Sequence, residues 1–289
     1  MSGARIIDGK ALAAAHRERI GARAGALRKG GRAARLDAVL VADGDNASRV
    51  YAENQAKTCA ALGIDHRLHE LPAGSRYDDI AGRVLLLSSD DDVTGIMVHL
   101  PLPSGVDAPR VQSLIAPEKD VEGVNPANIG NIVYGRSSLV PCTALATLKM
   151  VESTDVSLKG KTCVVVGASN IVGKPIAVLL MRHEATVVSC NKFTRGIEGL
   201  AREADVLIGA AGVPGLITKE WVKPGAIVVD VGATRVEQPD GTMKTVGDVR
   251  FDEVRAVAGW VSPVPGGVGP MTVAMLLDNV VTAAEGGRV

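Results

Sequence analysis

Large aromatic rings are almost absent from this sequence of 289 residues, because two Trp, three Tyr and two Phe make up only 2% of it. There is also no excess of charge, since 32 Lys and Arg balance 32 Asp and Glu. Because the sequence has no basic block and few rings on which bases could stack, we exclude nucleic acid as the main partner. The sequence has no uninterrupted apolar run of about 18 residues, and no basic N-terminal segment leads into an apolar stretch. We therefore predict neither a membrane span nor a secretory signal.

Paired cysteine spacings are missing as well. The four cysteines, at positions 59, 142, 163 and 190, lie far apart in the sequence. This distribution fits neither a zinc site nor a disulfide framework. We predict no metal, and we expect reduced thiols in a cytoplasmic protein.

What the sequence does contain is an alternation of strand and helix patterns, in a chain that is 46% hydrophobic. Short apolar runs alternate with amphipathic segments, which is typical of an α/β fold with parallel strands. Strands are predicted at residues 38–41, 68–71, 95–98, 161–166, 185–189, 206–208 and 226–231, and helices at 12–27, 48–62, 79–87, from 145 onward and at 272–284. Ser48 is predicted to cap the second helix, after a turn at residues 43–46.

Composition changes in a Gly- and Asn-rich stretch at residues 117–134, and a second α/β array begins near Thr143. The last helix is expected to pack back on the first array, which would make the first domain discontinuous. The predicted division is therefore 1–142 with 271–289 for one domain, and 143–270 for the other.

The strand that ends at Val166 is followed by a turn of small residues, Gly167-Ala168-Ser169-Asn170-Ile171-Val172-Gly173. Small residues let the backbone approach a phosphate, while the next helix offers free N–H groups and the positive end of its dipole. The spacing is not the common Gly-x-Gly-x-x-Gly. A tight turn that binds no nucleotide is therefore the alternative.

The next predicted strand leads into Lys192, with Arg195 nearby and no acidic residue between them. In dinucleotide folds this strand end meets the adenosine ribose, where an acid favours a free 2′-hydroxyl and a cation favours a 2′-phosphate. Lys192 thus favours NADP over NAD. The alternative is a solvated surface charge.

Three further segments are each unusual, and their combination in one sequence is specific. They are residues 97–103 (Met-Val-His-Leu-Pro-Leu-Pro), 117–123 (Pro-Glu-Lys-Asp-Val-Glu-Gly) and 263–272 (Pro-Val-Pro-Gly-Gly-Val-Gly-Pro-Met-Thr). Prolines in the first indicate a rigid elbow and a cis peptide, and the glycines of the third indicate backbone close to a ligand. With the turn at 167–173 and Pro141-Cys142-Thr143, the chain resembles the methylenetetrahydrofolate dehydrogenase/methenyltetrahydrofolate cyclohydrolase family from Ile6-Ile7-Asp8-Gly9-Lys10 to the last helix.

This resemblance implies an N-terminal α/β catalytic domain and a Rossmann-type NADP-binding domain with a parallel sheet, with folate in a cleft between them. It also implies a cytoplasmic homodimer that pairs through the nucleotide domain. In the family, methylenetetrahydrofolate gives a hydride to NADP, and the methenyl product is then hydrolysed in the same cleft.

The resemblance further implies the site residues. Catalytic positions are Tyr51, Gln55, His99 and Glu122. Substrate-binding positions are Tyr51, Val98, His99, Leu100, Glu122, Pro265, Gly266, Gly267, Val268 and Gly269. Cofactor-binding positions are Gly167, Ala168, Ser169, Ile171, Val172, Gly173, Lys192 and Ala233.

Three of these positions depart from the family pattern, which has Lys at position 55, Gln at 99 and Asp at 122. Tyr51 and residue 55 are spaced i and i+4, so both reach one ligand from the same helix face. Gln55 can hydrogen-bond but does not titrate near neutral pH. Lys57 lies roughly 200° around the helix from position 55, so it cannot replace the missing lysine. We therefore expect impaired or lost cyclohydrolase activity.

Hydride transfer depends less on the lysine, because it mainly requires the methylene carbon to lie close to the nicotinamide. His99 brings either a replacement acid–base group or only a hydrogen-bonding substitute. The main hypothesis is therefore an NADP-dependent methylenetetrahydrofolate dehydrogenase. The alternatives are a folate enzyme that transfers the methylene group to another acceptor, and a folate- or nucleotide-binding protein with little turnover.

Overall fold

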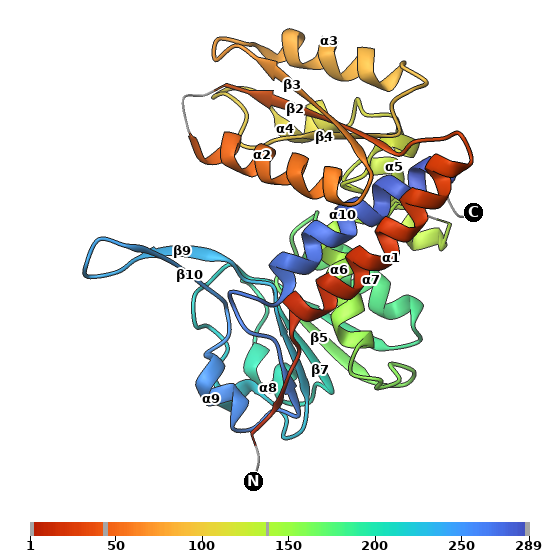
Figure 1. The fold of residues 1–289 in the computed structure, drawn as a ribbon. Helices are drawn as coiled ribbons and strands as arrows, with labels where there is room; N and C mark the ends of the chain where they lie inside the picture. Colours follow the sequence, from red (N-terminus) through yellow and green to blue (C-terminus); the bar gives the residue numbers. More distant parts are fainter. Residues whose placement is uncertain (1–2, 43–45, 137–138, 287–289) are drawn as a thin grey trace. The chain divides into compact units, whose positions relative to one another are not determined.

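The computed structural model describes residues 3–42, 46–136 and 139–286, and it divides into two compact α/β units (Figure 1). We name each unit after its main sheet. The six-stranded unit comprises Met1–Ala14 and Thr143–Met275, and the three-stranded unit comprises Ala15–Cys142 and Leu276–Val289. Both main sheets are parallel, so the predicted α/β fold class is confirmed.

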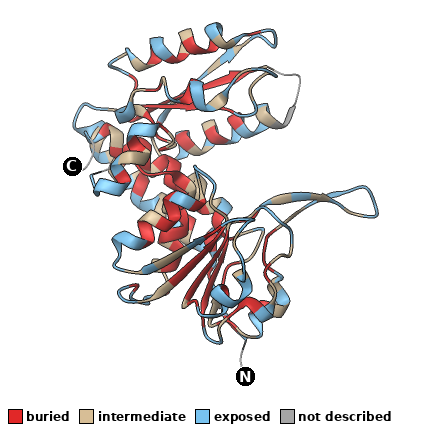
Figure 2. Ribbon diagram, turned by 180° about the vertical axis from the view of Figure 1, so that it is seen from behind, coloured by how far each residue is buried: buried red, intermediate tan, exposed pale blue. Residues whose placement is uncertain are grey.

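The three-stranded unit is built on a sheet in the order β3-β2-β4. Its strands are β2 (Arg35–Val41), β3 (Asp65–Leu71) and β4 (Gly95–Val98), and its helices are α2 (Asn46–Ala61), α3 (Tyr77–Ser88), α4 (Ala108–Gln112) and α5 (Pro126–Tyr134), with a 3₁₀ turn at Pro117–Lys119. Figure 1 shows α2 and α3 on opposite faces of this sheet. β2 is buried along its whole length because it has a neighbour on each side and a helix over each face (Figure 2). Residues 38–41 of β2 are a continuous apolar run and were predictable, whereas its first half contains Arg35 and Asp37, which pair with each other over 2.7 Å.

The six-stranded unit has the strand order β1-β11-β8-β7-β5-β6. Its sheet strands are β1 (Arg5–Ile6), β5 (Thr162–Val166), β6 (Thr186–Cys190), β7 (Val206–Gly209), β8 (Ile227–Asp230) and β11 (Trp260–Val261). The remaining elements are α6 (Cys142–Glu152), α7 (Gly173–Arg182), α8 (Ile197–Arg202), a 3₁₀ turn at Lys219–Trp221, α9 (Phe251–Arg255) and an antiparallel hairpin of β9 (Thr234–Glu237) and β10 (Met243–Val246). The strand order reverses between β5 and β7, the place where doubly wound sheets bind dinucleotides.

Two long helices, α1 (Gly9–Lys29) and α10 (Val268–Ala284), each contribute residues to both units. The observed division therefore differs at its edges from the predicted one, which gave 1–142 and 271–289 to a single domain. Residues 5 and 6 form β1, which pairs with β11 and so lies in the six-stranded sheet. A two-residue strand has no periodicity, and the sequence carried no signal of this long-range pairing. The predicted assignment of functions to the two domains stays a prediction.

Ser48 does not cap a helix, because α2 begins at Asn46 and Ser48 lies inside its first turn. Residues 43–45 of the predicted turn lie outside the described residues. The strand predicted at residues 68–71 is present and is longer than predicted, since β3 begins at Asp65. All four cysteines are buried and free.

Candidate active site

The structure brings four predicted site residues together near the carboxyl end of β4: Tyr51, Gln55, His99 and Glu122. His99 directly follows β4, and its peptide N–H donates to the Val39 carbonyl over 2.9 Å. This bond continues the sheet pairing by one residue and fixes where the imidazole begins. The peptide bond between Leu100 and Pro101, shortly after His99, is cis, as the proline-rich segment indicated.

Tyr51 supplies an aromatic surface from α2. Its ring meets the His99 ring edge-on, with centroids 5.8 Å apart and planes inclined at 81°. Tyr51 is still 46% exposed, so part of the ring is free for a ligand to stack on. Burial of the hydroxyl and the nearby Glu122 carboxyl raise the pKa of Tyr51, because both disfavour a phenolate.

Gln55 lies one helical turn after Tyr51, and its side chain is buried. Its amide Nε2 donates to the Met97 Sδ over 3.1 Å, and its Oε1 lies 3.4 Å from the His66 Nε2. His66 comes from β3 and was missed by the sequence reading, although it is a polar residue paired in register with fully buried Leu36. Lys57 is exposed, as its angle around the helix predicted.

Glu122 is held by its neighbours in the chain and by α10. Asn279 of α10 donates to the carbonyl oxygens of Val121 and Val140 over 2.8 and 2.9 Å. Gly123 has φ +69°, and a Cβ there would lie 2.4 Å from the Pro141 nitrogen, so only glycine fits next to Glu122. The backbone on both sides of Glu122 is therefore held in place.

The cluster formed by these four side chains carries little charge. Burial, with His66 nearby, lowers the pKa of His99 to about 4, so its imidazole is neutral at pH 7. Burial and the Asp120 carboxylate raise the pKa of Glu122 to about 7, although the Gln112 amide and the Val98 backbone oppose this shift by hydrogen bonding. No ammonium group is among the described contacts of Gln55.

Two buried polar atoms in this cluster, the His99 Nε2 and the Glu122 Oε2, have no hydrogen-bond partner among the described residues. Leaving a buried polar atom unpaired costs about 1–3 kcal/mol, so both atoms have hydrogen-bonding capacity that a ligand would satisfy. One is a ring nitrogen that donates or accepts, and the other is a carboxyl oxygen. Their chemistry fits a heterocycle with both donors and acceptors on its edge.

The raised pKa of Glu122 predicts a pH dependence of stability. Its ordinary value is 4.5 and its folded value is about 7, so the folded state favours the protonated form. The resulting stability is present below pH 4.5 and is lost as pH rises through 7, by up to about 3 kcal/mol. Urea unfolding at pH 5 and pH 8 should show that Glu122→Gln gains stability relative to the unmodified protein as pH rises. A pH-independent difference between the two proteins would contradict this assignment.

The predicted nucleotide turn lies in the other, six-stranded unit, between β5 and α7. Gly167 has φ +120°, and a Cβ there would lie 2.0 Å from the Ala210 carbonyl oxygen. A Cβ on Gly173 would lie 1.8 Å from the Gly167 carbonyl oxygen. Both positions therefore need glycine, which lets the strand, the turn and the helix approach closely. This bare backbone at the start of a ten-residue helix fits a phosphate group.

The other predicted cofactor positions surround this turn or follow neighbouring strands. Ser169 Oγ accepts the Gly173 N–H at 3.3 Å, while Ile171 is 52% exposed. Lys192 follows β6 and lies over the Phe193 ring, with its Nζ 5.0 Å from the centroid. Ala233 is exposed just after β8.

The predicted substrate loop Pro265–Gly269 also belongs to the six-stranded unit and leads into α10. There it packs on the start of α1, because a Cβ on Gly9 would lie 1.8 Å from the Gly267 carbonyl oxygen. The Val264–Pro265 peptide is cis. In the three-stranded unit, Val98 points into the core beside α3, so only its backbone is available to a ligand, whereas Leu100 is 50% exposed.

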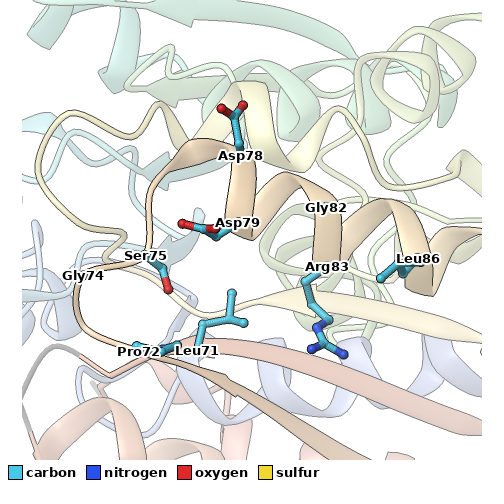
Figure 3. Close-up of a pocket in the computed structure, with 9 residues that line it drawn as sticks. All are labelled: Leu71, Pro72, Gly74, Ser75, Asp78, Asp79, Gly82, Arg83 and Leu86. Atoms are coloured by element: carbon cyan, nitrogen blue, oxygen red, sulfur yellow. The ribbon is translucent and has the colours of Figure 1, made fainter.

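A separate groove of about 540 Å³ lies between the end of β3 and helix α3 (Figure 3). It is lined by Leu71, Pro72, Gly74, Ser75, Asp78, Asp79, Gly82, Arg83 and Leu86, none of which is a predicted site residue. Within the described residues no cluster of three or more His, Cys, Asp or Glu side chains is arranged to hold a metal ion. In the same part of the chain, no helix combines the length and apolar character that a membrane crossing requires.

Two family models match this sequence. One, described as the catalytic domain of tetrahydrofolate dehydrogenase/cyclohydrolase, covers residues 7–122, and the other, described as its NAD(P)-binding domain, covers residues 141–288. The chain belongs to the tetrahydrofolate dehydrogenase/cyclohydrolase family. The match to the first family domain contains Tyr51, Gln55, His99 and Glu122, and the match to the second contains the Gly167–Gly173 turn.

Relatives in the family resemble the whole chain. The bifunctional protein FolD of Nitrosospira multiformis is 47% identical and covers 98% of this chain and 96% of its own. The crystal structure of the bifunctional FolD enzyme from Campylobacter jejuni has a TM-score of 0.91 at 39% identity, with 97% and 98% of the two chains covered. The Trypanosoma brucei FolD structure, complexed with NADP and an inhibitor, has a TM-score of 0.91 at 36% identity and covers 99% and 98%. These matches confirm the family resemblance and the two-domain α/β fold.

Proposed function

We propose that this protein oxidises methylenetetrahydrofolate to methenyltetrahydrofolate with NADP, and that its hydrolysis of the methenyl product is impaired or lost. The observation that carries the proposal is the environment of Gln55. Its amide is buried and engaged by Met97 and His66, at the position where the family pattern has a lysine. Hydrolysis needs a group that takes a proton from the attacking water, and an amide cannot take it.

Hydride transfer suits a pocket without a buried ammonium group. Removing a hydride from the methylene carbon leaves a cationic methenyl product, and a neighbouring cation would oppose that charge. Neutral His99 and Gln55 do not oppose it. NADP, when bound, supplies the nicotinamide ring that accepts the hydride.

For the folate we propose that Tyr51 stacks on its ring, that the Glu122 carboxyl and the His99 imidazole hydrogen-bond its polar edge, and that Leu100 and Pro265–Gly269 contact it. The unpaired Glu122 Oε2 and His99 Nε2 support this assignment. Glu122 is one methylene longer than the aspartate of the family pattern. The depth at which the ring sits is therefore expected to differ.

For the cofactor we propose NADP, bound by the Gly167–Gly173 turn, Lys192 and Ala233. Lys192 supports the choice, because its exposed ammonium follows β6, where a 2′-phosphate lies in folds of this type. The NADP described in the Trypanosoma brucei relative also supports it.

We also propose a cytoplasmic homodimer that pairs through the nucleotide-binding domain. The β9–β10 hairpin supports this assembly. It projects from the six-stranded unit as a two-stranded ribbon (Figure 1), and its residue Met243 is 55% exposed. An isolated two-stranded hairpin is marginally stable in water, so a second copy that covers it would stabilise it.

One assay tests the proposed activity. Purified protein is mixed with methylenetetrahydrofolate and NADP, or NAD at the same concentration, and NADPH and methenyl formation are followed separately from methenyl hydrolysis. We expect NADPH to form from NADP and NADH to form more slowly from NAD, while hydrolysis is no faster than in buffer. Folate binding without NADPH formation would contradict the proposal and favour methylene transfer to another acceptor.

A further inference from the structure

Two buried carboxylates, Asp230 and Asp248, lie at the carboxyl edge of the six-stranded sheet and have no part in the site described above. Asp230 is the last residue of β8, and Asp248 follows the β9–β10 hairpin. Their side chains are 3% and 0% exposed. Buried carboxylates are costly unless they are hydrogen-bonded, so their partners indicate what they hold in place.

Asp230 binds the backbone on both sides of the hairpin. Its Oδ1 accepts the N–H groups of Gly232 and Asp248 over 2.9 and 3.0 Å, and its Oδ2 accepts that of Val249 over 2.9 Å. A Cβ on Gly247 would lie 1.9 Å from this Oδ2. Asp230 thus fixes the backbone around Asp248.

Asp248 in turn binds the loop after β7. Its Oδ2 accepts the N–H groups of Ala211 and Gly212 over 2.6 and 3.0 Å. Its Oδ1 is buried, has no partner among the described residues, and would lie 2.3 Å from a Cβ on Gly232. The side chain therefore has one orientation, with Oδ2 committed to the β7 loop.

This loop forms one wall of the nucleotide turn. The Ala210 carbonyl, next to the two N–H groups that Asp248 binds, lies against Gly167. A continuous line of hydrogen bonds therefore runs from Asp230 through Asp248 to the β7 loop. Ala233, an expected cofactor contact, is adjacent to Gly232 and so depends on the same carboxylates.

The topology indicates which half of a dinucleotide lies beside the loops that Asp230 and Asp248 hold. The sheet order reverses between β5 and β7, and a dinucleotide lies across that point with one half over each side. The turn and Lys192 belong to the β5–β6 side, where the adenosine lies. The loops held by Asp230 and Asp248 follow β7 and β8, on the other side.

We propose that Asp248, fixed by Asp230, is a positioning residue for the nicotinamide half of the bound dinucleotide. The inference rests on the proposed NADP-dependent function. Asp248 holds the β7 loop by its backbone and touches no reacting atom. Without it the loop loses its anchor, and the nicotinamide loses a wall of its site, while the adenosine side keeps its contacts.

Two probes distinguish the adenosine half of the dinucleotide from its nicotinamide half. NADPH has both halves, whereas 2′,5′-ADP carries the adenosine and the 2′-phosphate but no nicotinamide. Affinities are measured by NADPH fluorescence and by competition with 2′,5′-ADP. For Asp248→Asn we expect NADPH binding to weaken about tenfold, because a neutral oxygen replaces the charged acceptor of two N–H groups. We expect 2′,5′-ADP binding to stay within a factor of two. Asp248→Ala should weaken NADPH binding further. If the Ala variant does not fold, the comparison rests on the Asn variant.

Asp205→Asn is the matched control. Asp205 also accepts a backbone N–H, that of Thr162 over 3.0 Å, and pairs with Lys223 over 2.8 Å, but it precedes β7 at the opposite, amino edge of the sheet. This variant should bind both probes normally. Equal losses for NADPH and 2′,5′-ADP in Asp248→Asn, or no loss for either, would overturn the inference. Unmodified protein that binds neither probe would instead overturn the proposed NADP dependence, and the inference with it.

Discussion

Replacing Gly173 by alanine is expected to weaken NADP binding at least about a hundredfold. A Cβ at this position would lie 1.8 Å from the Gly167 carbonyl oxygen and 2.7 Å from its carbon. Because both atoms are backbone, no side chain can move aside. The start of α7 must shift away from the turn by more than an ångström, and the N–H groups that face a phosphate shift with it. Titration of NADPH fluorescence measures the loss.

Gly199→Ala is the control for this substitution. Gly199 lies in α8 of the same unit, and no heavy atom lies within 4 Å of a Cβ placed there. Alanine is favoured over glycine in a helix interior by about 0.5–1 kcal/mol, so this variant should be slightly more stable and bind NADPH normally. A Gly173→Ala protein that is folded by circular dichroism and binds NADPH with unchanged affinity would show that the turn does not hold the cofactor.

The strands that carry the fold were predictable where they are buried on both faces. β5 and β8 are apolar except for Thr162 at the start of the first and Asp230 at the end of the second, because both faces of the sheet are covered there. β1 and β11 were not predicted. Each has two residues, and their pairing joins positions 5 and 260, which no local pattern reports.

The hairpin of β9 and β10 was also missed, although its turn contains Pro239-Asp240-Gly241, a typical turn sequence. Its strands are half-exposed and short, so their alternation of polar and apolar residues is weak. The turn residues are therefore the strongest local signal of structure in this segment.

In the candidate site, too, local spacing predicted some positions, whereas positions set by strand pairing could not be predicted. The spacing of Tyr51 and Gln55 by four residues correctly predicted a shared helix face, and the exposure of Lys57 follows from the same geometry. His66 could not be found in this way. It reaches Gln55 because β3 pairs with β2 in a register that sets it beside Leu36, and register depends on packing across the sheet.

Asp230 and Asp248 lie 18 positions apart in the sequence, with the hairpin between them, and they act through backbone N–H groups. Side-chain patterns carry no information on which N–H groups a carboxylate will accept. Family motifs therefore predicted which residues touch ligands, whereas the residues that hold the loops became visible only in three dimensions.

Replacing Gln55 by lysine is expected to raise methenyl hydrolysis about a hundredfold, the lower range for a positioned acid–base group. Position 55 is 4% exposed, and its present contacts are a thioether and an imidazole whose pKa burial lowers. An amine in these surroundings has a lowered pKa, because burial disfavours its charged form. Its neutral fraction near pH 7–8 is therefore larger than in water and can accept a proton from the attacking water. The hydrolysis rate should rise with pH and level off above that pKa.

The same lowered pKa predicts a change in stability that tests whether the new lysine is buried. A cation whose folded pKa lies below its unfolded value loses stability as pH falls through the folded value, so Gln55→Lys should be less stable at pH 6 than at pH 9 relative to the unmodified protein. Asn54→Lys adds the same charge at the adjacent exposed position and should change neither hydrolysis nor this pH dependence. If Gln55→Lys shows the pH-dependent stability but hydrolysis stays at the buffer rate, the lysine is in place and lacks a correctly held substrate. The longer Glu122 carboxyl and the His99 imidazole are then what prevent hydrolysis, and Glu122→Asp and His99→Gln in the lysine variant should restore it.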